Sequence, residues 1–290
     1  MFGKILFYTI LLAAYVNVTP EVLAQQQGLG NPTKTFTDPS QMTGLEASDS
    51  AEIARSWDAA IVRFPTRAGK SKTSSIAALA SDIDATRTYP VVIYMHGCSG
   101  VWQGTRDRIK FYADNGFLVI APVSFARLKY PKSCDVATNR GGLYRGTLAM
   151  RQKDAGYAIE MARKMPFVDG AKIVLAGLSQ GAITAATFSA ANPDQKTAAR
   201  VVEGWTCNAG WPEYKGVNAG ADEPVLTLVA KNDPWFQNEW TKGDCTKFLN
   251  KKNGSKSVVY SDGELAWRHE LLDLLAPQQE VLEFLQTQLN

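Results

Sequence analysis

The sequence is poor in the side chains that hold transition metals. It contains two histidines and four cysteines in 290 residues, and no two cysteines form a C-x-x-C pair. Structural zinc sites are built from closely spaced pairs of such ligands. We therefore expect no metal cluster in this protein.

An excess of charge of one sign is also missing. Lys and Arg number 31 against 28 Asp and Glu, which gives a net charge of +3, and the basic residues form no block. Proteins that follow a phosphate backbone concentrate Lys and Arg on one face or segment. We expect no nucleic-acid partner. With 45% hydrophobic and 20% charged residues, the composition is that of a globular protein and excludes a disordered, collagen-like or coiled-coil chain.

The apolar run near the N-terminus is too short for a membrane helix. It extends from residue 5 to about residue 18 and is followed by Pro20 and Glu21, whereas a membrane span needs about 20 apolar residues. Lys4, the apolar run and the small residue Ala24 together form the pattern of a signal peptide over residues 1–24. We expect cleavage after Ala24, export to the periplasm or the medium, and no stable membrane insertion afterwards. The alternative is an uncleaved membrane anchor.

The remainder of the chain divides into an arm and one domain. Residues 25–50 contain little apolar sequence, which predicts a flexible N-terminal arm or a strap on the surface. Residues 51–290 alternate short apolar runs with helix-length segments, which predicts a single α/β domain with a mostly parallel sheet covered by helices on both faces. The expected strands are 59–64, 91–95, 117–121, 173–176, 225–229 and 258–260, and the expected helices are 106–115, 146–164, 181–191 and 277–289.

A G-x-S-x-G segment lies between one of these strands and the helix that follows it. Residues 177–181 read Gly-Leu-Ser-Gln-Gly, and small residues follow them. Strand, G-x-S-x-G and helix in this order are typical of a nucleophile elbow, a turn so tight that its flanking positions must be glycine. The pattern predicts that Ser179 is a nucleophile, with the free amides at the helix start ready to stabilise an oxyanion.

A nucleophilic serine needs a histidine to accept its proton and a carboxylate to orient that histidine. His269 follows the last strand, whereas His96 precedes the serine, so the order Ser–Asp–His selects His269. Asp233 lies in the turn after strand 225–229, at the carboxyl end of the sheet, and is the expected acid. Asp262 is the second choice.

Acyl transfer also needs two hydrogen-bond donors for the developing negative oxygen. The backbone amide of Gln180 is the first expected donor because it follows the nucleophile directly. The second is expected in the turn 96–100, His-Gly-Cys-Ser-Gly, where the amide of Cys98 is favoured. His96 would then organise the loop and take no part in proton transfer.

These motifs together resemble the α/β-hydrolase superfamily over residues 59–290. The stretch Met150-Arg-Gln-Lys-Asp-Ala, which leads to Met165-Pro-Phe-Val-Asp, is similar to the dienelactone hydrolase-like branch. Prototypes of that branch use a cysteine nucleophile, and the serine at position 179 here favours carboxylic ester hydrolysis over dienelactone hydrolysis. The resemblance implies an α/β-hydrolase fold with an eight-stranded core sheet and the catalytic residues on loops at the strand carboxyl ends.

The resemblance also makes the cysteines interpretable. Four cysteines allow three pairings, among which spacing alone does not decide. Their places on the implied fold suggest disulfides Cys98–Cys134 and Cys207–Cys245, each bracing loops around the site. Free buried thiols are the alternative.

Tryptophans are concentrated in the loops expected around the site. Trp102, Trp205, Trp235 and Trp267 are the expected pocket residues, and Trp211 and Trp240 lie in the same loops. They would form an aromatic substrate pocket, or else anchor long loops. Basic residues between positions 127 and 145 would attract an anionic substrate or form a solvated surface.

The predicted function is that of an exported serine hydrolase that cleaves a small-molecule or polymeric ester through an acyl-enzyme. This chemistry needs neither a metal nor an organic cofactor. The alternatives are a peptidase on the same scaffold and a noncatalytic periplasmic binding protein that has kept the fold.

Overall fold

A computed structural model describes residues 35–290 of the chain. The predicted signal peptide and the first ten residues of the predicted arm lie outside the described residues. From residue 35 onward, each helix is too short or too polar to cross a membrane.

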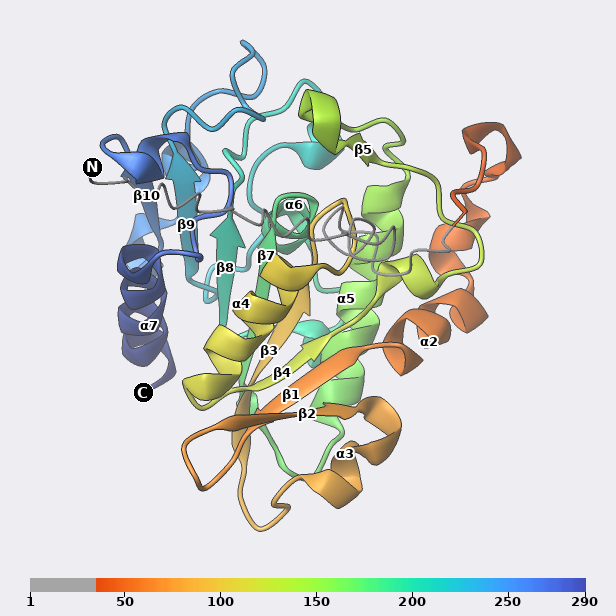
Figure 1. Cartoon of the computed structure of the whole chain (residues 1–290), viewed down its shortest axis with the longest axis vertical. Coiled ribbons are helices and arrows are strands. Elements are labelled where there is room, and N and C mark those ends of the chain that lie inside the picture. Colours follow the sequence, from red (N-terminus) through yellow and green to blue (C-terminus); the bar gives the residue numbers. More distant parts are fainter. Residues whose placement is uncertain (1–34) are drawn as a thin grey trace, which may run out of the picture.

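Eight strands form one mostly parallel sheet (Figure 1), as predicted. Their order is β10-β9-β8-β7-β3-β4-β1-β2, and the six strands from β10 to β4 run parallel. At the other edge β1 is antiparallel to both β4 and β2. The strands are β1 Ile61–Pro65, β2 Ser71–Ser75, β3 Tyr89–Met95, β4 Leu118–Ala121, β7 Val168–Leu178, β8 Ala199–Glu203, β9 Val225–Ala230 and β10 Lys256–Tyr260, and a separate small ribbon contains β5 Cys134–Asp135 and β6 Arg140–Gly141.

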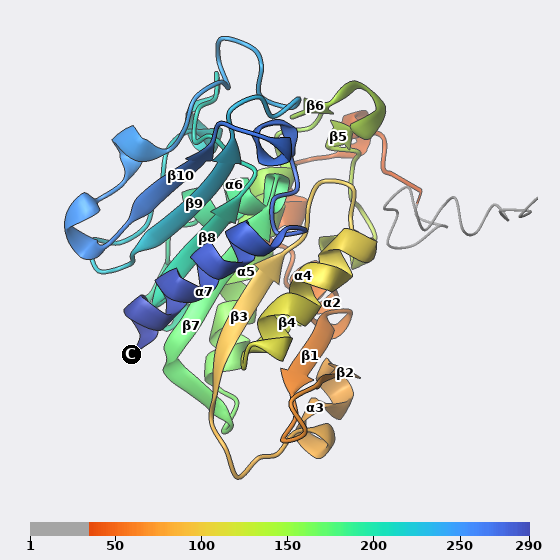
Figure 2. The same cartoon turned by 60° about the vertical axis from the view of Figure 1, so that its left-hand side comes forward.

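Helices cover both faces of the sheet, which confirms the predicted layers. They are α2 Ser50–Asp58, α3 Ile76–Asp82, α4 Gln103–Asp114, α5 Thr147–Arg163, α6 Gln180–Thr187 and α7 Leu275–Leu289. Figure 2 shows α4 and α7 lying across one face. Alternate residues of β3 belong to two hydrophobic clusters: Ile93 packs in the one that includes α5 and α6, and Tyr94 in the one that includes α4 and α7.

Several elements were not predicted, among them β2, α2, α3 and the ribbon of β5 and β6, and one helix is shorter than predicted. β2 consists of Ser, Lys and Thr at the sheet edge, so it lacks the apolar pattern of a buried strand. α2 and α3 precede or interrupt the expected strand–helix alternation. The helix expected over 181–191 ends at Thr187, because the Arg200 guanidinium donates to the carbonyl oxygens of Ala185 and Phe188, at 3.0 and 2.7 Å, and Phe188 is extended.

Residues 35–49 lie against the loop that follows β4. The ring of Phe36 meets that of Phe125 edge-on at 5.6 Å, and the Thr37 amide donates to the Tyr130 carbonyl. Arg127 donates to the carbonyl oxygen of Glu46 at 2.8 Å and, through the same guanidinium, binds the buried carboxylate of Asp154.

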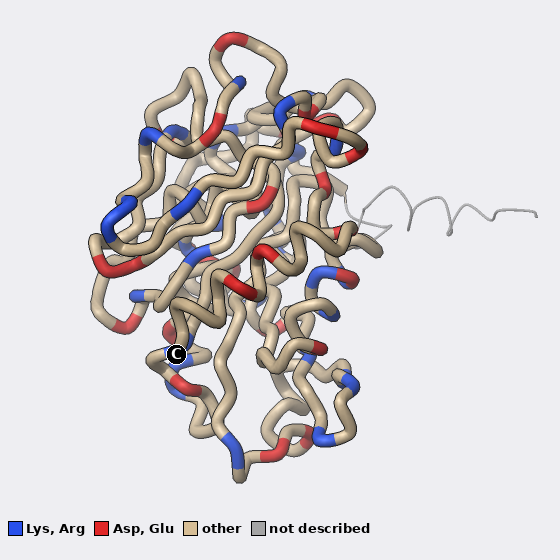
Figure 3. Tube along the Cα trace, turned by 90° about the vertical axis from the view of Figure 1, so that its left-hand side faces the viewer, with Lys and Arg blue, Asp and Glu red and all other residues tan. Residues whose placement is uncertain are grey.

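The loops that follow β3, β7, β8 and β9 lie together at the carboxyl end of the parallel strands (Figure 1). Ligands of open α/β sheets bind at this end of the sheet. Figure 3 shows basic and acidic residues interspersed over one side of the molecule, with neither sign forming a continuous stripe.

Candidate active site

Ser179 occupies a strained turn between β7 and α6. Its φ is 57° and its ψ is −118°, a region that non-glycine residues rarely adopt. A Cβ at Gly181 would collide with the Met95 carbonyl oxygen, and one at Gly177 with the backbone of Gly181 itself. The glycines of the motif are therefore required by close backbone approach, and the turn is the elbow that the sequence predicted.

His269 and Asp233 form a hydrogen-bonded pair. The Oδ2 atom of Asp233 lies 2.7 Å from the Nδ1 atom of His269, and the carboxylate is 1% exposed. The amide of Trp235 donates to the other carboxylate oxygen at 3.0 Å. A carboxylate at Nδ1 places the proton there and leaves Nε2 as the basic nitrogen. Nε2 is buried and has no hydrogen-bond partner within residues 35–290. Asp262, the second choice, is exposed and bonds to Ser261 instead.

Ser179 and His269 lie at the same end of β8. The Ser179 amide donates to the carbonyl oxygen of Glu203, the last residue of that strand, at 2.9 Å. The next residue, Gly204, packs against His269: a Cβ there would lie 3.2 Å from the imidazole Cε1. The nucleophile turn and the histidine loop therefore converge on two consecutive residues.

The expected oxyanion donors, Cys98 and Gln180, border the same space. Gln180 is the first residue of α6, so its amide has no acceptor inside the helix. Its side chain is held by Ser133 and Thr147, at 3.0 and 2.9 Å. The turn that contains Cys98 touches the serine, since a Cβ at Gly97 would lie 3.9 Å from the Ser179 Cβ.

His96 is fully buried beside this turn. Its Nδ1 atom lies 2.7 Å from the Gly97 carbonyl oxygen, its ring meets Phe125 edge-on, and Arg151 donates to its carbonyl oxygen. Burial, and next the Arg151 charge, hold the pKa of His96 well below its usual value. A neutral imidazole in these contacts fixes the loop, which is the role expected for it.

A buried ion pair that the sequence analysis missed supports the histidine loop. The Arg108 guanidinium binds both carboxylate oxygens of Glu203, at 2.7 and 2.8 Å, and both side chains are 1% exposed. Glu203 also accepts the amides of Leu271 and Leu272, each at 2.8 Å. These amides follow His269 closely, so Glu203 is a positioning residue for that loop. In the sequence, Glu203 directly follows the apolar residues Val201 and Val202. A charged residue at the end of a buried strand is rarely buried without a partner, and this could have indicated the ion pair.

Glu270, next to His269, shares the same arginine. Its Oε2 atom lies 3.3 Å from Arg108, and its side chain is 25% exposed. Burial raises the pKa of Glu270 to about 7. The positive charge of Arg108 acts to lower this pKa, but the negative charges of Glu203 and Asp273 act against it.

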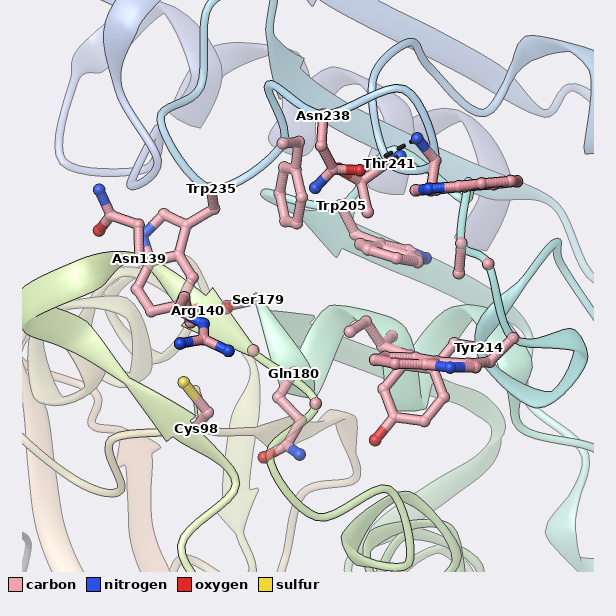
Figure 4. Close-up of a pocket in the computed structure, with 18 of the residues that line it drawn as sticks. Cys98, Asn139, Arg140, Ser179, Gln180, Trp205, Tyr214, Trp235, Asn238 and Thr241 are labelled. Carbon is pink, nitrogen blue, oxygen red and sulfur yellow. Dashed lines mark hydrogen bonds between the residues drawn. The ribbon is translucent and has the colours of Figure 1, made fainter.

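A cavity of about 560 Å³ opens at Ser179 (Figure 4). Six of its lining residues are aromatic, and no Asp or Glu belongs to the lining within residues 35–290. The lining side chains include Ser179, Gln180, Cys98, Ile183, Trp205, Trp211, Tyr214, Trp235, Phe236, Trp240, Asn139 and Arg140.

Two of the four expected pocket tryptophans line the cavity. Trp205 does so from the loop after β8, and Trp235 also stacks on the His269 ring, with centroids 5.2 Å apart. Trp102 does not line it, because its ring lies over Gly104 at the start of α4, and the exposed side chain of Trp267 lies outside the lining. Trp211 and Trp240 complete the aromatic lining instead.

Both expected disulfides are present. Cys98 is bonded to Cys134, which joins the turn beside Ser179 to the ribbon of β5 and β6. Cys207 is bonded to Cys245, which joins the loop after β8 to the loop after β9. Each bond connects two loops that border the cavity.

Solved structures of other proteins share this fold. A candidate dienelactone hydrolase from Klebsiella pneumoniae subsp. pneumoniae MGH 78578 superimposes with a TM-score of 0.52 at 18% identity, over 71% of this chain and 89% of its own. A sugar hydrolase from Lactococcus lactis gives a TM-score of 0.51 at 13% identity, over 80% and 95% of the two chains. A comparison with curated protein sequences gave no match.

The family model described as "Dienelactone hydrolase family" matches residues 76–267, a span that contains Ser179, Asp233 and both disulfides. The chain therefore belongs to the dienelactone hydrolase family.

Proposed function

We propose that this protein is an exported serine hydrolase that cleaves carboxylic esters through an acyl-enzyme. The observation that carries the proposal is the hydrogen bond between Asp233 and His269, which leaves the imidazole Nε2 without a hydrogen-bond partner within residues 35–290. This imidazole lies at the carboxyl end of the sheet, where the strained turn presents Ser179. This combination is what acyl transfer by a Ser–His–Asp triad requires.

In the first half of the reaction, Ser179 Oγ attacks the ester carbonyl carbon while His269 Nε2 accepts its proton. The resulting imidazolium is stabilised by the Asp233 carboxylate at Nδ1. The oxyanion accepts hydrogen bonds from the amides of Cys98 and Gln180. Nε2 then protonates the leaving alcohol, and the acyl group remains on Ser179 as an ester.

In the second half, His269 Nε2 takes a proton from water, and the hydroxide oxygen attacks the acyl carbonyl carbon. The same amides stabilise the second oxyanion. Collapse of this intermediate releases the carboxylic acid and returns the proton to Ser179 Oγ. All the proton transfers use side chains of this chain, and no cofactor enters the scheme.

Export is part of the proposal and rests on the signal-peptide pattern of residues 1–24, with support from the two disulfides. Disulfides persist in oxidising compartments, outside the cytosol. Expression with the native leader should give a periplasmic or secreted protein whose mass begins at Gln25. A full-length product in the membrane fraction would instead indicate an uncleaved anchor.

A fluorophosphonate probe tests the catalytic proposal. The wild-type protein should be labelled and should hydrolyse ethyl and aryl esters, whereas Ser179→Ala should lose both properties. Ser81→Ala, on the exposed surface of α3, is the matched control and should behave as the wild type. An unlabelled wild type would favour a noncatalytic binding protein, and cleavage of peptides but not of esters would favour a peptidase.

A further inference from the structure

The cavity beside Ser179 forms a slot lined by flat aromatic side chains, which suits a flat ring. Its apolar lining contains six aromatic side chains, and the aliphatic residues among the lining are Ile183 and Ala209. The aromatic residues are Trp205, Trp211, Tyr214, Trp235, Phe236 and Trp240. A binding site for a flexible fatty acyl chain would be lined by aliphatic side chains, whereas flat aromatic faces complement a flat ring.

Several of the aromatic side chains have packing partners of their own. Trp211 packs flush on Gly142, whose φ of 71° brings its backbone close to the indole, and the Arg145 guanidinium lies 5.4 Å from the indole centroid. Trp205 meets Phe236 edge-on at 5.3 Å, and Trp240 packs on Gly210. The Cys207–Cys245 disulfide joins the two loops that carry these rings.

The position of His269 decides which half of the ester enters the slot. The imidazole must reach the alcohol oxygen to protonate it, so the alcohol belongs on the side of Trp235, which stacks on His269. In Figure 4, Trp235 and Asn139 lie on one side of Ser179, and Trp205 and Tyr214 lie on the other. The second side is floored by Ile183, one turn along α6 from the serine. That side therefore receives the acyl group.

Trp205 forms a buried wall of the acyl side. Its side chain is 3% exposed, and in Figure 4 its indole nitrogen is at the end of the ring remote from Ser179. That nitrogen is itself inaccessible to solvent, so the ring offers the cavity an aromatic surface and no hydrogen-bond donor.

We propose that the acyl half of the substrate is a planar aromatic carboxylic acid. It lies between Trp205 on one side and Trp211 and Tyr214 on the other. The volume of about 560 Å³ lies within the range of about 300–1,000 Å³ that holds ligands of drug size, well beyond the needs of an acetyl group. This proposal rests on the ester hydrolysis proposed above.

A series of esters with one alcohol tests the acyl preference. Ethyl benzoate and ethyl cyclohexanecarboxylate have rings of similar size, but only the first is flat. We expect kcat/KM for ethyl benzoate to exceed that for ethyl cyclohexanecarboxylate and for ethyl hexanoate by about tenfold. Equal values for the flat and the puckered ring, or faster cleavage of an acetylated sugar, would overturn the proposal.

Variants locate the effect in the slot. Trp211→Ala should lower kcat/KM for ethyl benzoate by about tenfold and that for ethyl hexanoate by less than about twofold. Trp205→Phe keeps an aromatic wall and should retain the preference for ethyl benzoate over ethyl hexanoate. Trp267→Ala, an exposed tryptophan outside the cavity, is the matched control and should change neither value. Equal losses for both esters in Trp211→Ala would contradict a ring-binding slot.

A binding measurement separates this proposal from the catalytic one. In Ser179→Ala protein, 4-methoxybenzoate should quench tryptophan fluorescence and bind more tightly than cyclohexanecarboxylate. Binding of that kind by a protein that no fluorophosphonate labels would mean that the slot exists but the serine mechanism is wrong. Labelling of the wild type without any preference for the aromatic acid would mean the reverse.

Discussion

The two ends of β8 each bury an arginine–glutamate pair, in opposite order. At the amino end, Arg200 of the strand binds Glu223 at 2.5 Å, and the two side chains are 0% and 4% exposed. At the carboxyl end, Glu203 of the strand binds Arg108 at 2.7 Å, and both side chains are 1% exposed. Burial is therefore closely matched, although Arg108 binds both oxygens of Glu203 and Arg200 binds one oxygen of Glu223. The larger difference lies in the groups that each pair holds.

The amino-end pair joins elements of the scaffold. Glu223 accepts the amides of Thr197 and Gly220, each at 2.8 Å, while Arg200 ends helix α6 by binding its last carbonyl oxygens. The carboxyl-end pair instead holds the amides of Leu271 and Leu272, which follow His269. The same buried chemistry thus serves packing at one end of the strand and alignment of a candidate catalytic base at the other.

The charge balance of the two ends also differs. Within residues 35–290, Arg200 has one carboxylate partner in Glu223. Arg108 meets three carboxylates: Glu203, Glu270 at 3.3 Å and Asp273 at 2.9 Å. Asp273 is also bound by Arg268, at 2.8 Å, so Glu203, Glu270 and Asp273 outnumber the two arginines and the carboxyl end has one carboxylate in excess.

Removing the negative charge of Asp233 should give the largest effect on activity. Asp233→Asn keeps the size of the side chain but can stabilise neither the Nδ1–H tautomer nor the imidazolium. We expect kcat to fall by about 10⁴-fold, measured with a soluble aryl ester, and the rate of fluorophosphonate labelling to fall with it. A loss below tenfold would mean that the carboxyl end of β8 does not align a triad.

Breaking each buried pair should separate packing from alignment. Glu223→Gln leaves the buried Arg200 without a carboxylate and should lower the free energy of unfolding by about 3–5 kcal/mol in urea titrations. Glu203→Gln should cost about 3 kcal/mol, at the lower end of this range, because Arg108 keeps Glu270 and Asp273. Below the unfolding temperature, only Glu203→Gln should also lower kcat, by about 10- to 100-fold with little change in KM, because the His269 loop shifts.

The matched variant at the amino end makes this test decisive. If Glu223→Gln lowered kcat as much as Glu203→Gln does, the loss would follow from reduced stability alone. The positioning role of Glu203 would then be wrong.

The smallest expected effect concerns the surplus carboxylate at the carboxyl end. Because the folded protein raises the pKa of Glu270 to about 7 from an ordinary 4.5, the stability contributed by its protonated form is fully present below about pH 4.5 and is lost as pH rises through 7. Glu270→Gln cannot ionise and escapes this loss. Between pH 4.5 and 8 its free energy of unfolding should therefore rise relative to wild type by about 2 kcal/mol, discounted for partial exposure.

Urea titrations of both proteins at several pH values measure this difference. A difference that stays constant over that range would contradict the raised pKa. It would also remove the argument that negative charge is in excess at this end of β8.

Much of the fold could be predicted because its central strands are buried on both faces and therefore appear as continuous apolar runs. β2 could not, because an edge strand made of Ser, Lys and Thr gains its stability from pairing with β1 and leaves no apolar pattern. The end of α6 at Thr187 depends on Arg200, a tertiary contact that helix propensity does not contain.

The candidate site divides in the same way. Ser179, Asp233 and His269 could be named because a tight turn needs its glycines and because chain order assigns the acid and the base. The Arg108–Glu203 pair joins residues 95 positions apart, and no local pattern connects them. Trp102 and Trp267 were assigned to the pocket by their proximity in sequence to active-site residues, which does not determine where an indole ring points.

The route of the chain also sets the order in which the site is completed. The nucleophile turn follows β7, while His269 comes only after β8, β9 and β10, and Leu271, two residues beyond it, donates its amide to the Glu203 carboxylate at the end of β8. A chain that is synthesised from its amino end presents Ser179 well before the imidazole that would activate it. Hydrolytic competence would therefore be acquired at the close of folding, when the segment that leads into α7 docks, so that incompletely folded chains would remain inert toward the esters of the cell that makes them.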